Sequence, residues 1–408
     1  MDFTIVDLAE PDVTQPLGSY GKPWLCRDIF GVLHCTYNKY FSTGPRWRVM
    51  HGYSSDNGAT WTLEEVPGAP SGTGSFAMDA GILTDSVGRV HIIYEYRAAP
   101  STTHYIKHAI KTGGSWSSED VTSWVAYSAN SALASLVSGL DSFDNIHILF
   151  SRQTGSTTYE LRYISNAGGS WGGEATVMTA TSYSTMPQYR SLCVDILGNL
   201  HFVYSLSADR TKVRYRQGVP WGAEEVIETF GFNVYPDDLA ASTTGLVLGI
   251  YRSGGANGYI KRKPTPGAWE AAEAVFTPDT GFFTSDSAPV ISTEMKEGLI
   301  DLEDASSTYY FKMKLWQKIG GVWLGSTYQS AQDQIEDSWG YPLSHLYPSH
   351  FGAYPGLLAN NEIMMFREIY SDIIYDYGVA FMKGIFPPVT ARPAQGSIAH
   401  RLVGQGAI

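Results

Sequence analysis

Four histidines of this chain recur in the same short phrase, in which an aspartate stands six residues before the histidine. The pairs are Asp28 and His34, Asp85 and His91, Asp141 and His147, and Asp195 and His201. A histidine beside a carboxylate can act as a general acid or base, and clustered histidines can bind a metal. The same pairing can instead hold a hairpin, through a hydrogen bond between the two side chains. Because the histidine keeps one position of a repeat, we expect this structural role for all four.

The histidine phrase belongs to a longer repeat that must position these residues. The phrase is Asp-x-x-Gly-x-x-His followed by an apolar run that ends in an aromatic residue, with Asp144 replacing the glycine in the third copy. Three weaker copies follow, with Leu248, Asp301 and Met364 at the histidine position, and the steps average 55 residues. A tryptophan closes six of the seven units in phase with the phrase. Repeats of this kind are typical of solenoids, propellers or arrays.

The strand pattern within the units selects among these architectures. Each unit contains four strand-like runs bounded by Gly, Pro, Asn or Asp, and helical periodicity is nearly absent. The sequence therefore predicts an all-β fold, a seven-bladed β-propeller of four-stranded antiparallel blades. In the last unit we expect strands at 357–359, 363–368 and 373–377, with a further one at 379–382.

The two ends of the chain lie outside the repeat. The run at residues 2–8 precedes the first unit, and we expect it to pair with the last blade as a closing strand. Without such pairing, the edges of the first and last blades would leave backbone groups unsatisfied. The predicted domains are therefore a propeller at 1–385 and an extended C-terminal tail at 386–408.

Composition excludes several classes of function. With 28 Lys and Arg against 40 Asp and Glu, the net charge of −12 disfavours nucleic-acid binding. No run of 18 apolar residues is present, so membrane insertion is not expected, and the acidic N-terminus lacks the features of a signal peptide. Three cysteines are too few for a disulfide framework, and no zinc-ligand spacing, phosphate-binding loop or serine nucleophile elbow appears. We expect no cofactor and no metal, with stray calcium at an aspartate-rich turn as the alternative.

One turn carries a complete Asp-box, the motif Ser/Thr-x-Asp-x-Gly-x-x-Trp/Phe. Its motif positions are Ser54, Asp56, Gly58 and Trp61. Asp and Ser side chains can bond the backbone of a tight turn, Gly permits a positive φ, and Trp fills the space between strands, so a structural role is expected. The motif resembles the Asp-box of sialidase-like and other bacterial-neuraminidase-repeat (BNR) propellers. The resemblance covers residues 20–385 as architecture and implies the fold rather than an activity.

The resemblance to sialidases stops at a residue that matters for their activity. Sialidases carry a carboxylate-binding arginine in an aromatic-Arg-Ile-Pro motif, and this chain has Gly21 at that position. Sialidase activity is therefore not expected. Propeller polysaccharide lyases are other relatives to consider, and they need a proton acceptor or donor and a charge neutraliser, commonly His, Tyr and Arg. The weak catalytic candidates of these types are His104, Tyr189 and Arg190.

Ligand-binding residues are expected where the repeat is broken, on the rim opposite the aspartate turns. The most irregular stretch precedes the seventh unit, and its aromatic and polar side chains suit sugar rings. Arginines near the propeller axis could bind carboxylates or sulfates of an acidic glycan. The candidates in the irregular stretch are Trp339, Tyr341, His345, Tyr347 and His350. The remaining candidates are Arg97, Arg152, Tyr235, Arg252 and Arg367.

The C-terminal tail differs in chemistry from the propeller body, because it contains two arginines and no acidic residue. We expect it to dock on other assembly subunits through Arg392, His400, Arg401 and Leu402. A signal-less, cysteine-poor propeller with such a tail resembles a bacteriophage virion component, such as a tail or fibre module. That resemblance implies a virion-associated protein, the other location being the cytoplasm.

Two functions follow from these observations. The leading hypothesis is a non-enzymatic glycan-recognising or structural propeller of a larger assembly, with a receptor-binding role. The alternative is a carbohydrate-active enzyme that acts on an acidic glycan, a polysaccharide lyase rather than a glycoside hydrolase.

Overall fold

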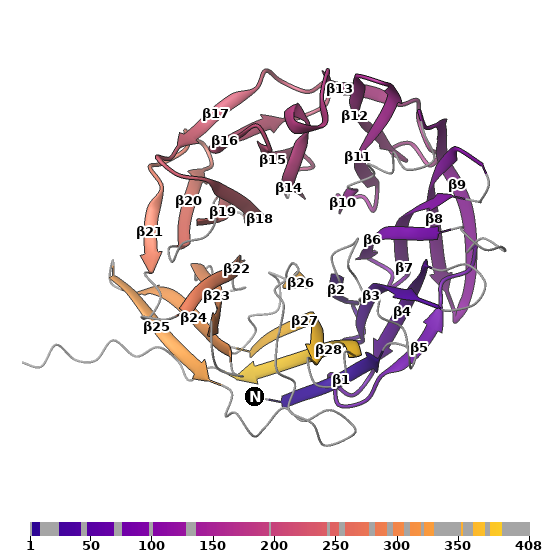
Figure 1. The fold of residues 1–408 in the computed structure, drawn as a ribbon. Coiled ribbons are helices and arrows are strands. Elements are labelled where there is room, and N and C mark those ends of the chain that lie inside the picture. The colour runs from indigo at the N-terminus through magenta and orange to yellow at the C-terminus, as the bar shows by residue number, and fades with distance from the viewer. Residues whose placement is uncertain are drawn as a thin grey trace, which may run out of the picture.

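The chain folds into antiparallel sheets arranged around a common axis (Figure 1). The structure is a computed structural model. It describes residues 2–8, 24–41, 47–68, 76–97, 101–127, 136–195, 197–242, 245–252, 258–276, 282–291, 297–305, 311–319, 322–329, 352–353, 362–371 and 376–385. These residues form strands β1 to β28 and one short 3₁₀ helix, η1 (Tyr183–Thr185). The fold is a β-propeller, as the sequence predicts.

The first five repeat units each provide four consecutive strands. Unit one contains β2 (Trp24–Arg27), β3 (Leu33–Tyr40), β4 (Trp47–Ser54) and β5 (Thr62–Glu65), and unit two contains β6 (Phe76–Thr84), β7 (Val90–Arg97), β8 (Thr103–Thr112) and β9 (Ser115–Val125). Unit three contains β10 (Val137–Leu140), β11 (Ile146–Gly155), β12 (Thr158–Ser165) and β13 (Ala175–Ala180), and unit four contains β14 (Pro187–Val194), β15 (Leu200–Leu206), β16 (Asp209–Gln217) and β17 (Glu225–Thr229). Unit five contains β18 (Val234–Ser242), β19 (Gly245–Arg252), β20 (Gly258–Pro264) and β21 (Glu273–Phe276).

The remaining strands complete the ring. Unit six contains β22 (Phe282–Ile291), β23 (Glu297–Ala305), β24 (Phe311–Ile319) and β25 (Val322–Gln329). The last sheet has the order β1-β28-β27-β26, from β1 (Asp2–Leu8), β28 (Asp376–Ile385), β27 (Glu362–Ser371) and β26 (Gly352–Ala353). Units one and two form one eight-stranded sheet, joined by a parallel pair between Trp47 and Phe76. The predicted count of seven units is obtained only when this sheet is counted as two blades, divided between β4 and β6.

The N-terminal run closes the ring. β1 pairs antiparallel with β28, with Asp2 opposite Lys383 and Leu8 opposite Gly378. It therefore occupies the outer strand position of the last sheet (Figure 1). The prediction of separate strands at 373–377 and 379–382 was wrong, because Asp376–Ile385 is one continuous strand that pairs with β27. The fourth strand of this sheet is β1. The strand expected at 357–359 lies outside the described residues.

The hydrophobic core lies between neighbouring sheets. The second strand of each of the first four units is almost wholly buried, because it faces a neighbouring sheet on both sides. Between units two and three, Ile93 and Ile106 pack in one cluster with Ile146, Ile148 and Phe150. Full burial of such a side chain contributes about 1.5–3 kcal/mol, so these contacts hold adjacent units together.

The Asp-box turn lies between β4 and β5. The Ser54 hydroxyl accepts a hydrogen bond from the backbone N–H of Gly58 at 2.8 Å and donates one to Asp56 at 2.7 Å. Asp56 also accepts from the backbone and hydroxyl of Thr60, and these bonds lower the pKa of its carboxyl to about 2. Gly58 has a φ of 92°, and the Trp61 indole donates to the Gly58 carbonyl at 3.2 Å. The motif residues therefore shape this turn.

Candidate functional site

The repeated histidine and aspartate are hydrogen-bonded in all four complete copies. The turn between the first and second strands places the carboxylate beside the histidine Nε2. The distances are 3.3 Å for His34 and Asp28, 3.1 Å for His91 and Asp85, 3.2 Å for His147 and Asp141, and 3.1 Å for His201 and Asp195. The other carboxylate oxygen accepts hydrogen bonds from backbone N–H groups of the turn. For Asp28 the donors are the N–H groups of Phe30 and Val32, at 2.9 Å each. The aspartate therefore fixes both the turn and the imidazole.

The second ring nitrogen of each histidine contacts a side chain on the third strand. In units one and two this partner is another histidine, with Nδ1 to Nε2 distances of 3.1 Å (His34 to His51) and 2.9 Å (His91 to His108). In units three and four it is a tyrosine hydroxyl, at 2.8 Å (His147 to Tyr163) and 2.7 Å (His201 to Tyr215). Sequence reasoning missed these partners. The available signal was a His or Tyr that follows the repeated histidine by 14 to 17 residues.

In units one and two the contact chain continues to a fourth group. His51 Nδ1 lies 2.7 Å from Glu64, and His108 Nδ1 lies 2.9 Å from Glu119. In each of these two units, a row of three polar contacts thus runs from the turn aspartate through two imidazoles to a glutamate. Two neutral imidazoles supply only two N–H donors for these three contacts. In unit three, one neutral imidazole and one tyrosine hydroxyl supply two donors for two contacts. In unit four the Tyr215 hydroxyl also donates to Gln217 at 3.0 Å.

The histidines of these chains are buried, and burial disfavours their charged form. It lowers the pKa of His34 to about 4, and it also lowers the pKa of His51, His91, His108, His147 and His201. Both ring nitrogens of each of these imidazoles contact other side chains of the protein, so none is placed for chemistry with a solvent-borne substrate.

The third-strand rings of these chains also contact the next unit. Each lies edge-on to the tryptophan of the following unit, with centroid distances of 5.3 Å for His51 and Trp116, 5.6 Å for His108 and Trp171, 5.7 Å for Tyr163 and Trp221, and 5.3 Å for Tyr215 and Trp269. The Trp171 indole also donates to Glu119 at 2.8 Å. The third-strand ring therefore links the repeated histidine of one unit to the repeated tryptophan of the next, across the seam between units.

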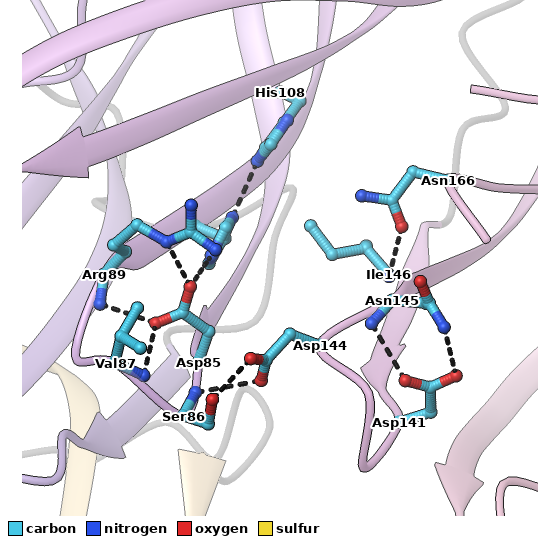
Figure 2. Close-up of polar contacts among 11 residues, drawn as sticks. Asp85, Ser86, Val87, Arg89, His108, Asp141, Asp144, Asn145, Ile146 and Asn166 are labelled. Atoms are coloured by element: carbon cyan, nitrogen blue, oxygen red, sulfur yellow. Dashed lines mark hydrogen bonds and ion pairs between the residues drawn. The ribbon is translucent and has the colours of Figure 1, made fainter. Parts of the chain in front are cut away.

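Neighbouring aspartate turns are also joined directly. Ser86 donates its backbone N–H and its hydroxyl to the Asp144 carboxylate at 2.9 and 2.5 Å (Figure 2). Asp144 has a φ of 63°, close to that of the glycines it replaces. A residue other than glycine thus keeps the positive φ here and gains a contact with the adjacent unit.

A different cluster lies at the opposite rim, where β7 ends and β8 begins. His104 Nδ1 lies 2.5 Å from a carboxylate oxygen of Glu95, and both side chains are at most 1% exposed. The His104 ring stacks on Trp124 at 5.3 Å and meets the edge of Phe76 at 5.9 Å. The Arg97 guanidinium lies over the Phe76 ring at 4.4 Å. We call Phe76, Glu95, Arg97, His104 and Trp124 the rim cluster.

Three polar atoms of the rim cluster are buried without a hydrogen-bond partner among the described residues. They are Oε2 of Glu95, Nε2 of His104 and Nε1 of Trp124. A buried unpaired polar atom costs about 1–3 kcal/mol, so such atoms concentrated in one place require a physical reason. The carboxylate offers an acceptor, the indole a donor, and the imidazole either, according to its tautomer. Hydroxyl groups, which donate and accept, match this set.

The rim cluster contains two of the residues expected from sequence, Arg97 and His104. It adds Glu95, which is the one acidic residue of β7. It also adds Phe76 and Trp124, which carry no motif. Whether these residues bind a ligand stays a prediction.

Other expected ligand residues are engaged elsewhere. The Arg152 guanidinium pairs with Glu160 at 2.8 Å and with Glu174 at 2.9 Å, so its charge is balanced within unit three. The Tyr235 hydroxyl accepts a hydrogen bond from Arg210 at 3.0 Å. Neither residue lies in the rim cluster.

Several further expectations lie beyond what the structure describes. Arg252 and Arg367 fall on β19 and β27, and Tyr189 and Arg190 fall on β14, but their side chains are outside the description. The irregular stretch with Trp339, Tyr341, His345, Tyr347 and His350, and the tail with Arg392, His400, Arg401 and Leu402, lie outside the described residues.

The described part of the chain contains neither a metal site nor a membrane-spanning helix. Its described residues contain no group of three or more His, Cys, Asp or Glu side chains arranged to hold a metal ion. No helix in the described ranges is long and apolar enough to cross a membrane.

Comparison with known proteins concerns the fold. No protein-family model matches the sequence, and a search of curated proteins finds no match. A polysaccharide lyase, a PL25 ulvan lyase, has a similar structure with a TM-score of 0.50 and 11% identity, over 79% of this chain and 83% of that chain. The NanB sialidase from Streptococcus pneumoniae has a TM-score of 0.46 and 13% identity over 93% and 70% of the two chains. An α-L-arabinanase from Penicillium chrysogenum, solved with arabinobiose, has a TM-score of 0.47 and 12% identity over 94% and 98%.

Proposed function

We propose that this protein is a glycan-recognising β-propeller. The observation that carries the proposal is the rim cluster, in which three buried polar atoms without partners lie beside two aromatic rings. Sugars present apolar C–H faces and hydroxyl edges, which fit aromatic faces and a mixed set of donors and acceptors. Bound hydroxyls would supply the missing partners of Glu95, His104 and Trp124.

The proposed ligand is an acidic glycan. Arg97 brings a guanidinium to the edge of the cluster, over the Phe76 ring. A guanidinium can bind a carboxylate or sulfate through two parallel hydrogen bonds. Replacing Arg97 by glutamine should therefore weaken binding of sulfated or uronate-containing glycans more than binding of neutral ones.

Two tryptophan variants test the site. Trp124→Phe removes a buried indole N–H that lacks a partner in the rim cluster, and Trp116→Phe removes an equally unpartnered one at the seam between units one and two. A glycan panel with titration calorimetry should show about five- to tenfold weaker binding for Trp124→Phe and unchanged binding for Trp116→Phe. Equal binding by both variants, or no binding by the wild-type protein, would contradict the proposal.

A second candidate function is a polysaccharide lyase, and the Glu95–His104 contact favours it. A carboxylate that holds one ring nitrogen orients the imidazole, and the other nitrogen could then accept a proton beside a uronate carboxylate bound by Arg97. Incubation with uronate-containing polysaccharides should then produce absorbance from unsaturated chain ends, and His104→Gln should abolish it. Glycan binding without any such product removes the lyase function and leaves recognition.

We further propose that the propeller belongs to a virion assembly, as a bacteriophage tail or fibre module with a receptor-binding role. Its support is sequence chemistry alone: a tail at 386–408 with two arginines and no acid, appended to an acidic body. Deleting residues 387–408 should leave a folded propeller that no longer joins its assembly. Unchanged incorporation of the shortened chain would contradict the docking role of the tail.

A further inference from the structure

Four turns at one end of the propeller expose an apolar side chain at the same position. Each turn joins the first and second strands of a unit, and the residue stands two after the turn aspartate. The exposed fractions are 74% for Phe30, 59% for Val87, 78% for Phe143 and 69% for Leu197. We call these four residues the apolar crown. Single exposed apolar residues are common, but adjacent ones at one repeated position mark an interaction surface.

The turn itself does not require an apolar residue at this position. The crown residue contributes only its backbone N–H to the turn. This N–H donates to the aspartate, at 2.9 Å for Phe30 and 2.8 Å for Phe143. Any residue other than proline supplies that donor. The apolar side chains, which point to solvent instead of the core, therefore need another explanation.

The crown residues of the first three units belong to one continuous surface. The Phe30 ring lies against the next turn, because a Cβ built on Gly88 would come within 2.4 Å of it. The second and third turns are joined through Ser86 and Asp144, beside the crown residue Val87 (Figure 2). One extended segment can therefore contact crown residues of several units.

The charges around the crown select its partner. The aspartates of these four turns are Asp28, Asp85, Asp141, Asp144 and Asp195, against the arginines Arg27 and Arg89. The third and fourth turns, which carry Phe143 and Leu197, contain aspartates and no basic residue. The fitting partner is thus both apolar and basic. A second crown face would oppose aspartates to aspartates in a chain whose net charge is −12, so stacking of two crowns is disfavoured.

The C-terminal segment of this chain has the required chemistry and begins at the right place. Residues 386–408 contain Arg392 and Arg401, no acidic residue, and the apolar residues Ile398, Leu402, Val403 and Ile408. The last residue of β28, Ile385, pairs with Glu362, the first residue of β27. In units one to four the crown turn immediately precedes the first residue of the equivalent second strand. The chain therefore leaves the last sheet at the crown end of the ring.

We propose that residues 386–408 bind the apolar crown of their own propeller. In the free chain the segment covers this apolar surface and brings its arginines into the negative potential of the acidic turns. The proposal does not depend on glycan binding, which concerns the opposite rim.

Limited trypsin digestion of the full-length protein tests this contact. Cleavage after Arg401 reports how often the segment is released, since Arg392 is followed by proline and resists trypsin. The double variant Phe143→Ser, Leu197→Ser should speed this cleavage about five- to tenfold. The matched control is Val125→Ser, Tyr127→Ser, which changes two residues of 67% and 60% exposure at the end of β9. It should leave the rate unchanged.

Two results would overturn the proposal. One is an equal cleavage rate in the wild type, the crown variant and the control variant. The other is protection that grows with protein concentration, which would place the segment on the crown of another copy. Thermal unfolding of each variant checks that the surface substitutions leave the propeller folded, as expected for exposed positions.

Discussion

Replacing His108 by tyrosine should leave the propeller nearly as stable as the wild type, whereas replacing it by phenylalanine should destabilise it. The equivalent positions in units three and four carry Tyr163 and Tyr215, whose hydroxyls lie 2.8 and 2.7 Å from the repeated histidines. These tyrosines contact the next tryptophan edge-on, as His108 does with Trp171. A tyrosine therefore fits this position of the repeat.

The magnitude follows from the partner that phenylalanine cannot provide. His91 is 5% exposed, and its Nδ1 contacts only His108 among the described residues. Leaving a buried acceptor unpaired costs about 1–3 kcal/mol, and this is the expected difference between the two variants. Tyrosine gives up the contact with Glu119, whose side chain is 57% exposed and retains the Trp171 indole and water as partners. The His108→Tyr change should therefore cost less than about 1 kcal/mol.

Urea unfolding at pH 7.5, followed by tryptophan fluorescence, measures both variants against the wild type. Equal denaturant slopes would show that the free energies of unfolding can be compared directly. Tyr163→Phe is the matched control, because it removes the same hydroxyl bond to His147 and should cost a similar amount. If His108→Phe and His108→Tyr unfold at the same urea concentration, the hydrogen-bond chain is not what this position contributes.

Three further predictions concern acid, the turns and their contacts. The buried histidines have lowered pKa values, so at mildly acidic pH the unfolded chain binds more protons than the folded chain. The free energy of unfolding should therefore fall as the pH drops from about 6.5 to about 4. Urea titrations across that range check this, and a constant value would contradict it. Gly88→Ala should destabilise by about 1–2 kcal/mol, because Gly88 has a φ of 83° and its Cβ would meet the Phe30 ring. Calorimetric melting of both variants checks this, and Gly113→Ala should destabilise the protein less than Gly88→Ala, since no atom lies within 4 Å of a Cβ built on Gly113. Ser86→Ala should cost about 1 kcal/mol by removing the hydroxyl bond to Asp144, and equal melting temperatures would show that this contact contributes nothing.

The sequence predicted the elements whose signals are local. The Asp–His hydrogen bonds follow from a six-residue spacing across one turn, and the four strands of each of the first five units follow from runs bounded by turn residues. The partners His51 and Tyr163 lie on the third strand, diagonally opposite the repeated histidine of the second strand. Their contact therefore depends on the register of the two strands, which spacing along the chain does not fix. The rim cluster was found only in part for the same reason, because Trp124 reaches His104 from β9.

Leu248, which the repeat assigns to the histidine position, lies on the opposite face of its strand from the repeated histidines. In units one to four, five residues separate the paired ends of the first and second strands, as between Val194 and Leu200. In unit five only two residues separate Ser242 from Gly245. Shortening the turn by an odd number exchanges the two faces of the strand that follows. Leu248 accordingly packs in the cluster that contains Val203 of unit four.

This difference in turn length explains why the aspartate turn is part of the seam between units. A turn of five residues directs the repeated histidine toward the following unit, where its third-strand partner meets the next tryptophan, as Tyr215 meets Trp269. The shorter turn of unit five has neither the aspartate nor the histidine, and Leu248 faces the preceding unit instead. In units one to four the histidine thus stands on the face of its strand that the turn directs toward the following unit. Because its third-strand partner meets the tryptophan of that unit, this placement supports a role in joining successive units rather than a catalytic one.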